Sequence, residues 1–195
     1  MSLGLNTKDG DDLAILNTAR MRLEPITLQH LDGLCAMNSH IEVMRYISGQ
    51  PETRNETEAS IAIIQRCWAA WDTGWWAFIE PASGRVAGAG CIQYARREAE
   101  RPAEFESVRS NPLEIGWRLH PDFWRQGFAS EAAARMATFA FESLAAPEII
   151  AVRHPDNAAS AGVMDRLGML YRGQEVWYGK MCPTYVLSRE DWLKP

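Results

Sequence analysis

Two stretches of the sequence hold residues that could do chemistry, and the first is HPDFWRQGFASEAA (residues 120–133). It places a glycine and small residues directly before an alanine-rich run that is predicted to be a helix. Backbone N–H groups converge at the start of a helix, and the helix dipole favours an anion there. Gly127 would let the backbone approach an anion closely, and Ser130 would add a hydroxyl donor. The stretch predicts an anion site, with a simple tight turn as the alternative.

The second stretch is LEIGWRLH (residues 113–120), whose alternation predicts a strand. Glu114 shares one face with Gly116 and Arg118, and the other face is apolar. An alkyl amine has a pKa near 10.4 and is mostly protonated at neutral pH, so its acylation requires a group that takes a proton. Glu114 is the candidate base or water-positioning residue. The alternative is a structural salt bridge with a neighbour.

The elements that position these residues follow from the periodicity of apolar side chains. The expected strands cover residues 19–26, 75–80, 85–94, 113–120, 148–154, 171–178 and 183–187. One helix is expected after Thr27, and two more cover 41–47 and 57–71. A fourth runs from the 120–133 stretch to about Leu144, and a short fifth helix ends at Gly168. This order predicts a single-domain α/β (α+β) fold with a mixed sheet and helices on both faces. Residues 1–16 are expected to form a flexible polar leader, and 17–195 the domain.

Composition excludes several classes of function. The net charge of −5 and the pI near 5.4 argue against nucleic acid as a partner. No apolar run approaches the roughly 20 residues of a membrane-spanning helix, so no membrane partner is expected. The chain shows neither a secretory signal nor a disulfide pattern, which favours a cytoplasmic location.

The cysteines, histidines and strand glycines suggest no further site. The four cysteines and four histidines show no CxxC or HExxH spacing, so no metal site is expected. The glycines of GRVAGAGCI lie inside an alternating strand and do not open a helix, so close packing is favoured over a nucleotide loop. Cys91 is interpreted as a small buried strand residue rather than an acyl acceptor.

The arrangement of these motifs resembles a known family. EIGWRLHPDFWRQGFASEA, then a strand, then HPDNAASAGVMDRLGM, is similar to the GNAT superfamily of N-acetyltransferases, in its RimJ/RimL-type branch. The resemblance extends back through MRYI to ARMRLEPITLQHLDGL and so spans nearly the whole chain. It implies a mostly antiparallel sheet of about seven strands, in which two splayed parallel strands form a cleft for the co-substrate acetyl-CoA.

The resemblance also implies roles for individual residues. Leu119 matches the position whose backbone meets the pantetheine arm, and Asn157 and Ser160 match polar positions that contact the arm. Ser160 is also a candidate for protonating the leaving thiolate, with helix capping as an alternative. The turn that binds the pyrophosphate corresponds to Arg125, Gln126, Gly127, Phe128, Ala129 and Ser130.

Two departures from the family pattern stand out. The broader pattern has glutamine or arginine where this chain has Trp124. The tyrosine that many members use as a general acid falls at Met164.

The resemblance therefore implies an acetyl-CoA-dependent N-acetyltransferase that works by direct attack in a ternary complex. The acceptor is either a protein N-terminal amine or a small amine, including amino-acid derivatives. A catalytically inactive acyl-CoA-binding or sensor domain is the alternative, and a homodimer is left open. The polar loop 95–112 is either solvated or a flap over the acceptor site. Four tryptophans either form an aromatic wall for the acceptor or pack in the core: Trp68, Trp71, Trp75 and Trp76.

Overall fold

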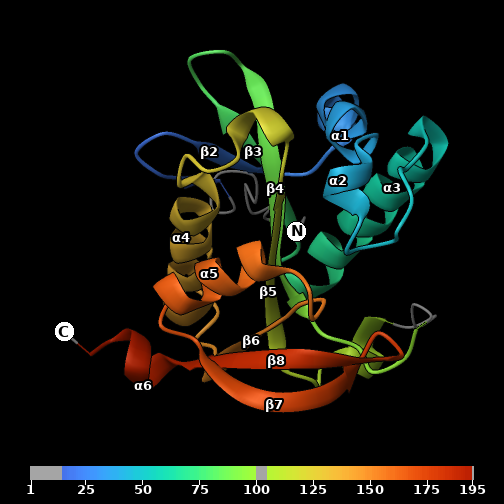
Figure 1. The fold of residues 1–195 in the computed structure, drawn as a ribbon. Coiled ribbons are helices and arrows are strands. Elements are labelled where there is room, and N and C mark those ends of the chain that lie inside the picture. The colour runs from blue at the N-terminus through green and yellow to red at the C-terminus, as the bar shows by residue number, and fades with distance from the viewer. Residues whose placement is uncertain (1–14, 100–104, 195) are drawn as a thin grey trace, which may run out of the picture.

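The chain folds around one mixed sheet with helices on both faces (Figure 1). The computed structural model describes residues 15–99 and 105–194. The strands are β1 (Leu16–Asn17), β2 (Arg22–Pro25), β3 (Trp75–Glu80), β4 (Arg85–Tyr94), β5 (Leu113–Leu119), β6 (Glu148–Val152), β7 (Leu170–Trp177) and β8 (Lys180–Ser188). The α-helices are α1 (Leu31–Asn38), α2 (Ile41–Met44), α3 (Arg54–Trp71), α4 (Phe128–Glu142), α5 (Ala158–Arg166) and α6 (Arg189–Trp192). Three 3₁₀ helices are η1 (Leu28–His30), η2 (Phe105–Val108) and η3 (Pro121–Phe123).

The strand order across the sheet is β1-β2-β3-β4-β5-β6-β8-β7. All neighbouring strands pair antiparallel except β5 and β6, which run parallel. The predicted fold class, a single-domain mixed and mostly antiparallel sheet, is therefore confirmed. The sheet has eight strands rather than about seven, because β1 has two residues and is too short to show alternation. None of the helices in the described ranges combines the length and the apolar character needed to span a bilayer.

The parallel pair opens into a gap, as the predicted splay requires. β5 and β6 are paired along Leu113–Glu114 and Ile149–Ile150, where the ladder between them ends. β5 nevertheless continues to Leu119, and β6 continues to Val152. The two strands thus separate toward their carboxyl ends, beside the turn that leads into α4.

The glycines of β4 allow this strand to pack closely against its neighbours. A Cβ atom on Gly90 would lie 2.7 Å from the carbonyl oxygen of Gly116, and one on Gly88 would lie 2.5 Å from that of Arg118. Side chains do not fit at such distances, so the interpretation of these glycines as sites of close approach agrees with the structure. The carbonyls of Gly116 and Arg118 point to β4, so the backbone groups of Leu119 face the gap on the β6 side.

Each face of the sheet carries its own apolar cluster. Side chains of α4, among them Ala133 and Met136, pack with Leu113 and Ile115 of β5. On the other face α1 and α3 cover β3 and β4 (Figure 1). The apolar side of β5 therefore faces α4, and Glu114 points to the opposite face, which confirms the predicted strand parity.

Helix α3 begins earlier than predicted. The prediction was residues 57–71, with Thr53 among the candidate caps, and the helix begins at Arg54. Thr53 Oγ1 accepts a hydrogen bond from the Glu56 amide, and the Glu56 carboxylate accepts one from the Thr53 amide. This reciprocal capping box fixes the first turn.

The predicted leader, residues 1–16, lies outside the described residues except for its last two. Leu16 is 2% exposed and pairs with Leu23 in β2. Leu16 is therefore part of the folded sheet, one residue before the predicted start of the domain.

Candidate active site

The predicted anion site is the turn between β5 and α4. Arg125 (φ 59°) and Gly127 (φ 83°) both adopt left-handed backbone conformations. A residue with a Cβ is strained there, and glycine is not. Gly127 is the N-cap of α4, and within the described part of the chain no side chain caps this helix end. The first N–H groups of α4 are therefore open to an acceptor outside the chain.

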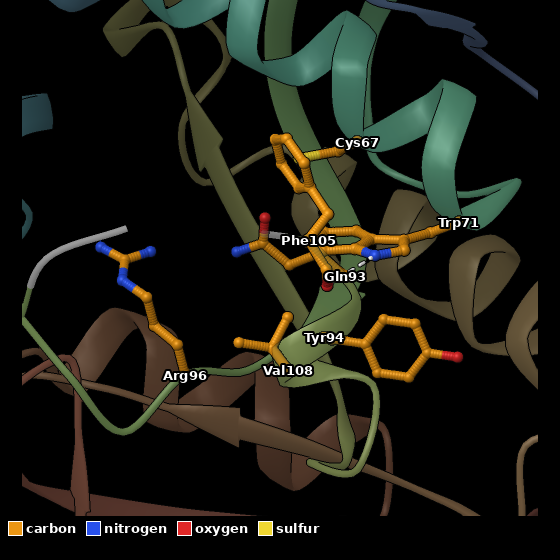
Figure 2. A pocket seen from close by; sticks show the side chains of 7 residues that line it. All are labelled: Cys67, Trp71, Gln93, Tyr94, Arg96, Phe105 and Val108. Carbon is orange, nitrogen blue, oxygen red and sulfur yellow. Dashed lines mark hydrogen bonds between the residues drawn. The ribbon is translucent and has the colours of Figure 1, made fainter. Parts of the chain in front are cut away.

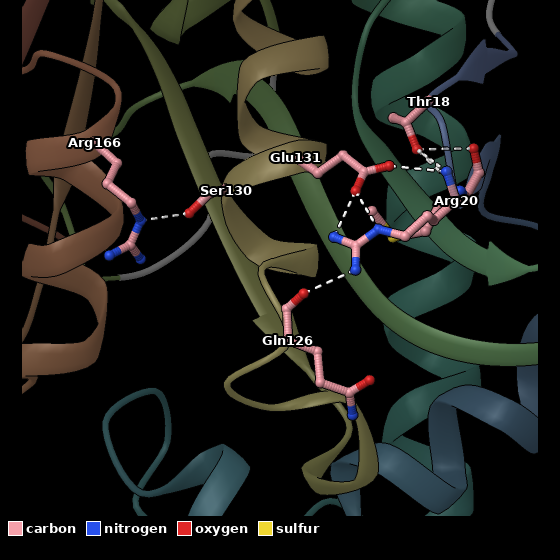
Figure 3. A network of polar contacts seen from close by, with 7 residues as sticks. Thr18, Arg20, Gln126, Ser130, Glu131 and Arg166 are labelled. Atoms are coloured by element: carbon pink, nitrogen blue, oxygen red, sulfur yellow. Dashed lines mark hydrogen bonds and ion pairs between the residues drawn. The ribbon is translucent and has the colours of Figure 1, made fainter.

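Arg20 holds the turn from the side of β1 (Figure 3). Its Nη1 donates to the carbonyl oxygen of Gln126 at 2.8 Å, and its Nε and Nη2 lie 2.7 and 2.6 Å from Glu131 Oε2. Its guanidinium carbon also lies 4.3 Å from the centre of the Phe128 ring. Arg20 thus connects the residue before Gly127 to the first turn of α4, which fixes the backbone of the turn.

A second arginine reaches the turn from α5. Arg166 Nε donates to Ser130 Oγ at 2.8 Å (Figure 3). A hydroxyl that accepts this bond keeps its own hydrogen for another acceptor. Arg166 therefore adds positive charge beside the start of α4, where the helix dipole already favours an anion.

The turn is closed onto β5 by Trp124, the first departure from the family pattern. Trp124 Nε1 donates to the carbonyl oxygen of Leu119 at 2.9 Å, and Gln126 Nε2 donates to that of Asp122 at 2.7 Å. Because its carbonyl is engaged, the backbone N–H is the group that Leu119 presents to the gap.

The turn between β6 and α5 is built differently. Asn157 is the N-cap of α5, and its Oδ1 accepts a hydrogen bond from the Ser160 amide at 3.1 Å. Both residues were predicted to contact the cofactor arm, with helix capping as an alternative for Ser160. In the structure Asn157 is the residue that caps the helix, and Ser160 donates its amide to that cap. Ser160 and Glu114, the two predicted catalytic residues, lie in separate parts of the site. Ser160 is in the first turn of α5, whereas Glu114 contacts β4 and the turn between β7 and β8.

Glu114 is a buried carboxyl group, 8% exposed, on β5. Burial raises its pKa to about 7, although hydrogen bonds from Tyr178 and Gln93 and the charge of Arg96 favour the carboxylate. A carboxylate with a pKa near neutral can take a proton from an amine and release it again at working pH. The hydrogen-bond partners of this side chain are the Tyr178 phenol and the Gln93 amide, and Arg96 is a cation whose charge acts on it.

Tyr178 is the functional candidate that sequence reasoning missed. Its hydroxyl donates a hydrogen bond to Glu114 Oε2, across 64 positions of the chain. The tyrosine that many family members use as a general acid falls at Met164, which is 1% exposed and belongs to the core. Tyr178 follows β7 and precedes Gly179, so the sequence signals a turn there, but no local pattern directs its side chain to Glu114.

A small pocket lies next to this site, between α3, the end of β4 and η2 (Figure 2). Phe105 of η2 packs edge-on against Trp71 of α3, with ring centres 5.4 Å apart, and its carbonyl accepts a hydrogen bond from Trp71 Nε1 at 3.2 Å. This part of the predicted 95–112 loop thus covers α3, although residues 100–104 lie outside the described ranges. The pocket is lined by Cys67, Trp71, Gln93, Tyr94, Arg96, Phe105 and Val108.

The four tryptophans of the predicted aromatic wall divide into two pairs. Trp76 is fully buried, and Trp68 packs edge-on against it with ring centres 4.9 Å apart, so both belong to the core. Trp71 lines the pocket, and Trp75 Nε1 donates to Gln93 Oε1 at 3.0 Å. Trp71 is nevertheless 7% exposed and belongs to a core cluster with Cys67 and Val108, so the core alternative holds for three of the four tryptophans.

Cys91 is 1% exposed on β4, and burial raises the pKa of its thiol well above the ordinary value. The protonated thiol is a poor nucleophile, which agrees with its interpretation as a packing residue. Within residues 15–99 and 105–194, no group of three or more His, Cys, Asp and Glu side chains is arranged to hold a metal ion.

Comparison with known proteins assigns this arrangement to a family. The sequence model described as "Acetyltransferase (GNAT) domain" matches residues 20–170, which include both strand-to-helix turns and Glu114. The chain belongs to the GNAT acetyltransferase family. The predicted resemblance to the GNAT superfamily is confirmed, and so is the prediction of an enzyme, because relatives of this GNAT chain are named N-acetyltransferases. GNAT acetyltransferases use acetyl-CoA as the acetyl donor.

Two curated relatives of this GNAT acetyltransferase cover most of its length. FsC-acetyl coenzyme A-N(2)-transacetylase from Aspergillus fumigatus is 29% identical over 190 residues, which cover 92% of this chain and 78% of that protein. The uncharacterized N-acetyltransferase YoaA from Bacillus subtilis is 29% identical over 161 residues, which cover 82% of this chain and 84% of that protein.

Solved structures show the same fold. An acetyltransferase from Agrobacterium tumefaciens superposes with a TM-score of 0.73 at 20% identity, covering 96% of this chain and 98% of the other. RimL, described as a ribosomal alpha-N-protein acetyltransferase in complex with coenzyme A, superposes with a TM-score of 0.72 at 13% identity, covering 91% and 99%.

Proposed function

We propose that this enzyme transfers the acetyl group of acetyl-CoA to a primary amine by direct attack in a ternary complex. One observation carries the proposal. Glu114, a buried carboxyl group with a pKa of about 7, lies at the position where the ladder between β5 and β6 ends and the gap begins. A group able to take a proton therefore stands at the inner end of the opening that would admit the thioester.

The cofactor contacts that we propose lie along the gap between β5 and β6, from Leu119 to the turns that begin α4 and α5. The N–H of Leu119 faces the gap and is placed to meet the pantetheine arm or the thioester carbonyl, where one preorganised donor is worth about 3 kcal/mol. The amide NH₂ of Asn157 and the hydroxyl of Ser160 are groups that the cap bond leaves for the arm. The pyrophosphate would bind the turn formed by Arg125, Gln126, Gly127, Phe128, Ala129 and Ser130.

Glu114 acts on the acceptor in this proposal. The carboxylate takes one proton from R–NH₃⁺, directly or through a water, and so frees the nitrogen lone pair for attack on the thioester carbonyl carbon. A C–N bond forms and the C–S bond breaks. The amine nitrogen gives up two protons in all, of which one ends on the CoA sulfur and one is released to solvent, so the products are R–NH–acetyl, HS–CoA and H⁺.

The acceptor in this proposal is a small amine, such as an amino-acid derivative, or a protein N-terminus. The name of the Aspergillus relative, an N(2)-transacetylase, supports the first, and the shared fold with RimL supports the second and the RimJ/RimL-type branch. A panel of both acceptor types with thiol release as the readout decides between them. The cytoplasmic location and a homodimer stay predictions.

Replacing the carboxyl group tests the proposal. Glu114→Gln should lower kcat by roughly 10² to 10⁴ at neutral pH, the range of a positioned base, with little change in acetyl-CoA affinity. The carboxylate is ionised above a pKa of about 7, so the wild-type rate should rise with pH through that value. The variant should lack this limb and recover toward wild type as the free amine becomes abundant.

Glu142→Gln at the exposed end of α4 is the matched control, because it removes a carboxylate from a helix that covers the face of the sheet opposite Glu114. It should leave kcat and its pH profile unchanged. A folded Glu114→Gln enzyme with normal kcat at neutral pH would show that the proton leaves by another route.

A further inference from the structure

The turn between β7 and β8 carries a tyrosine in an unfavourable backbone conformation. Tyr178 (φ 56°) and Gly179 (φ 71°) are both left-handed. Two-residue hairpin turns of this kind favour asparagine followed by glycine, and a bulky residue with a positive φ is uncommon. The geometry of the hairpin turn therefore does not favour a tyrosine at this position. The contacts of the Tyr178 side chain indicate a different role for it.

The segment after β4 holds this turn in place. The Tyr178 amide donates to the Arg96 carbonyl at 2.9 Å, and the Gly179 amide donates to the Arg97 carbonyl at 2.8 Å. The two guanidinium groups pack on aromatic rings, Arg96 at 4.6 Å from the centre of the Tyr178 ring and Arg97 at 3.8 Å from that of Trp177. The backbone and ring of Tyr178 are thus fixed without its hydroxyl.

The hydroxyl makes the contact with the candidate base. It donates to Glu114 Oε2 and lies 3.5 Å from Gln93 Nε2, while Gln93 Oε1 accepts from Trp75 Nε1. Gln93 and Arg96 also line the pocket beside β4, where the Gln93 side chain is directed to the side on which Arg96 lies (Figure 2). The hydroxyl that contacts the Glu114 carboxylate therefore comes from the C-terminal hairpin and the amide beside it from β4, so neither comes from the two strands that form the gap.

We propose that Tyr178 is a positioning residue for Glu114: its hydroxyl orients the carboxylate and favours the charged form that takes the amine's proton. This inference rests on the proposed function, because it requires Glu114 to be the proton acceptor. A hydrogen bond donated to a carboxylate stabilises that form, so loss of the hydroxyl makes the carboxylate harder to ionise.

Among the described residues, the other charged and titratable groups around Glu114 are Arg96 after β4, Cys91 on β4 and Cys182 on β8. Burial raises the pKa of both thiols, so they stay protonated while Glu114 titrates. Arg96 keeps its position on an aromatic ring if phenylalanine replaces Tyr178. The substitution Tyr178→Phe therefore isolates the hydroxyl.

The pH profile of Tyr178→Phe is the test. The acidic limb of kcat should move upward by roughly one pH unit, so the rate below the limb should fall about tenfold and should approach wild type at high pH. Acetyl-CoA affinity and the melting temperature should change little. Tyr171→Phe, which removes a hydroxyl from an exposed tyrosine of the same hairpin, should leave the profile unchanged.

A double variant separates this inference from the proposed function. Because Tyr178 acts through Glu114, the Glu114→Gln/Tyr178→Phe enzyme should be no slower than Glu114→Gln alone. An unshifted limb in a folded Tyr178→Phe enzyme, or additive losses in the double variant, would overturn the role of Tyr178 and leave that of Glu114 standing. A wild-type limb that survives Glu114→Gln would instead overturn the proposed function.

Discussion

The two strand-to-helix turns of this enzyme begin with the same tripeptide and end in different structures. His120 and His154 each start a His-Pro-Asp sequence, and each accepts a hydrogen bond at Nδ1 from the amide of the aspartate two residues later. After β5 the chain then passes through two left-handed residues, and Gly127 leaves the start of α4 without a side-chain cap. After β6, Asn157 caps α5 itself.

The shared tripeptide determines only the first part of each turn. It forms a similar local structure in both places, because the histidine contact spans only two residues. The residues after it decide whether the helix N–H groups are used inside the chain or are left for a ligand. We therefore expect affinity for acetyl-CoA to depend more on the first turn, and stability more on the second.

The strongest test of this contrast is Gly127→Val. Valine is strained at a φ of 83°, and its Cβ would lie 3.3 Å from Arg20 Nη2, so the turn should shift away from the ligand. Affinity for acetyl-CoA, measured by calorimetry, should fall by an order of magnitude or more. Gly49→Val is the matched control, because Gly49 has a φ of 79° and nothing lies within 4 Å of its Cβ position. Unchanged affinity in a folded Gly127→Val protein would exclude this turn as the cofactor site.

A smaller loss of affinity is expected when the support of the first turn is removed. Arg20→Gln breaks the contacts to Gln126 and Glu131, so the turn must be ordered on binding, and the Kd for acetyl-CoA should rise roughly three- to tenfold. Arg22→Gln is the control, because Arg22 is similarly exposed and contacts Glu24 instead. Equal affinity in both variants would mean that the turn keeps its shape without Arg20.

The smallest effect on affinity is expected at the second turn. Asn157→Ala removes the cap of α5 and should lower the free energy of unfolding by about 1 kcal/mol, measured by denaturant titration. The Kd for acetyl-CoA should rise only about two- to threefold, because the proposed contact of the Asn157 amide with the pantetheine arm is one neutral hydrogen bond. A tenfold loss of affinity would show instead that the second turn supports the cofactor as strongly as the first, and the two turns would then share one function.

The sequence predicted the parts of this fold that depend on neighbouring residues. Strand parity placed Glu114 opposite the apolar face of β5, and turn composition placed the hairpin of β3 and β4. Short elements were wrong in extent: the predicted helix 41–47 ends at Met44, and the predicted strand 183–187 extends over Lys180–Ser188. Such boundaries depend on tertiary packing, which a local pattern does not contain.

The candidate site was predictable in the same uneven way. Glycine and small residues predicted the turn before α4, and the alternation of the strand predicted the position of Glu114. Tyr178 could not be found from the sequence, because its contact with Glu114 joins positions 64 residues apart through the docking of a hairpin turn. Capping of α5 was an alternative for Ser160, but the cap is formed by Asn157, three residues earlier, because the residue that caps a helix is set by where the helix begins.

The ion pair between Arg20 and Glu131 has a consequence for the order in which parts of the enzyme fold. The two residues are 111 positions apart, so this contact closes a long loop that contains β2 to β5. Helix α4 can form early from its own sequence, yet its first turn acquires its fixed shape only when the N-terminal segment has docked. The part of the acetyl-CoA affinity that depends on Arg20 should therefore return during refolding only after this long-range contact has closed.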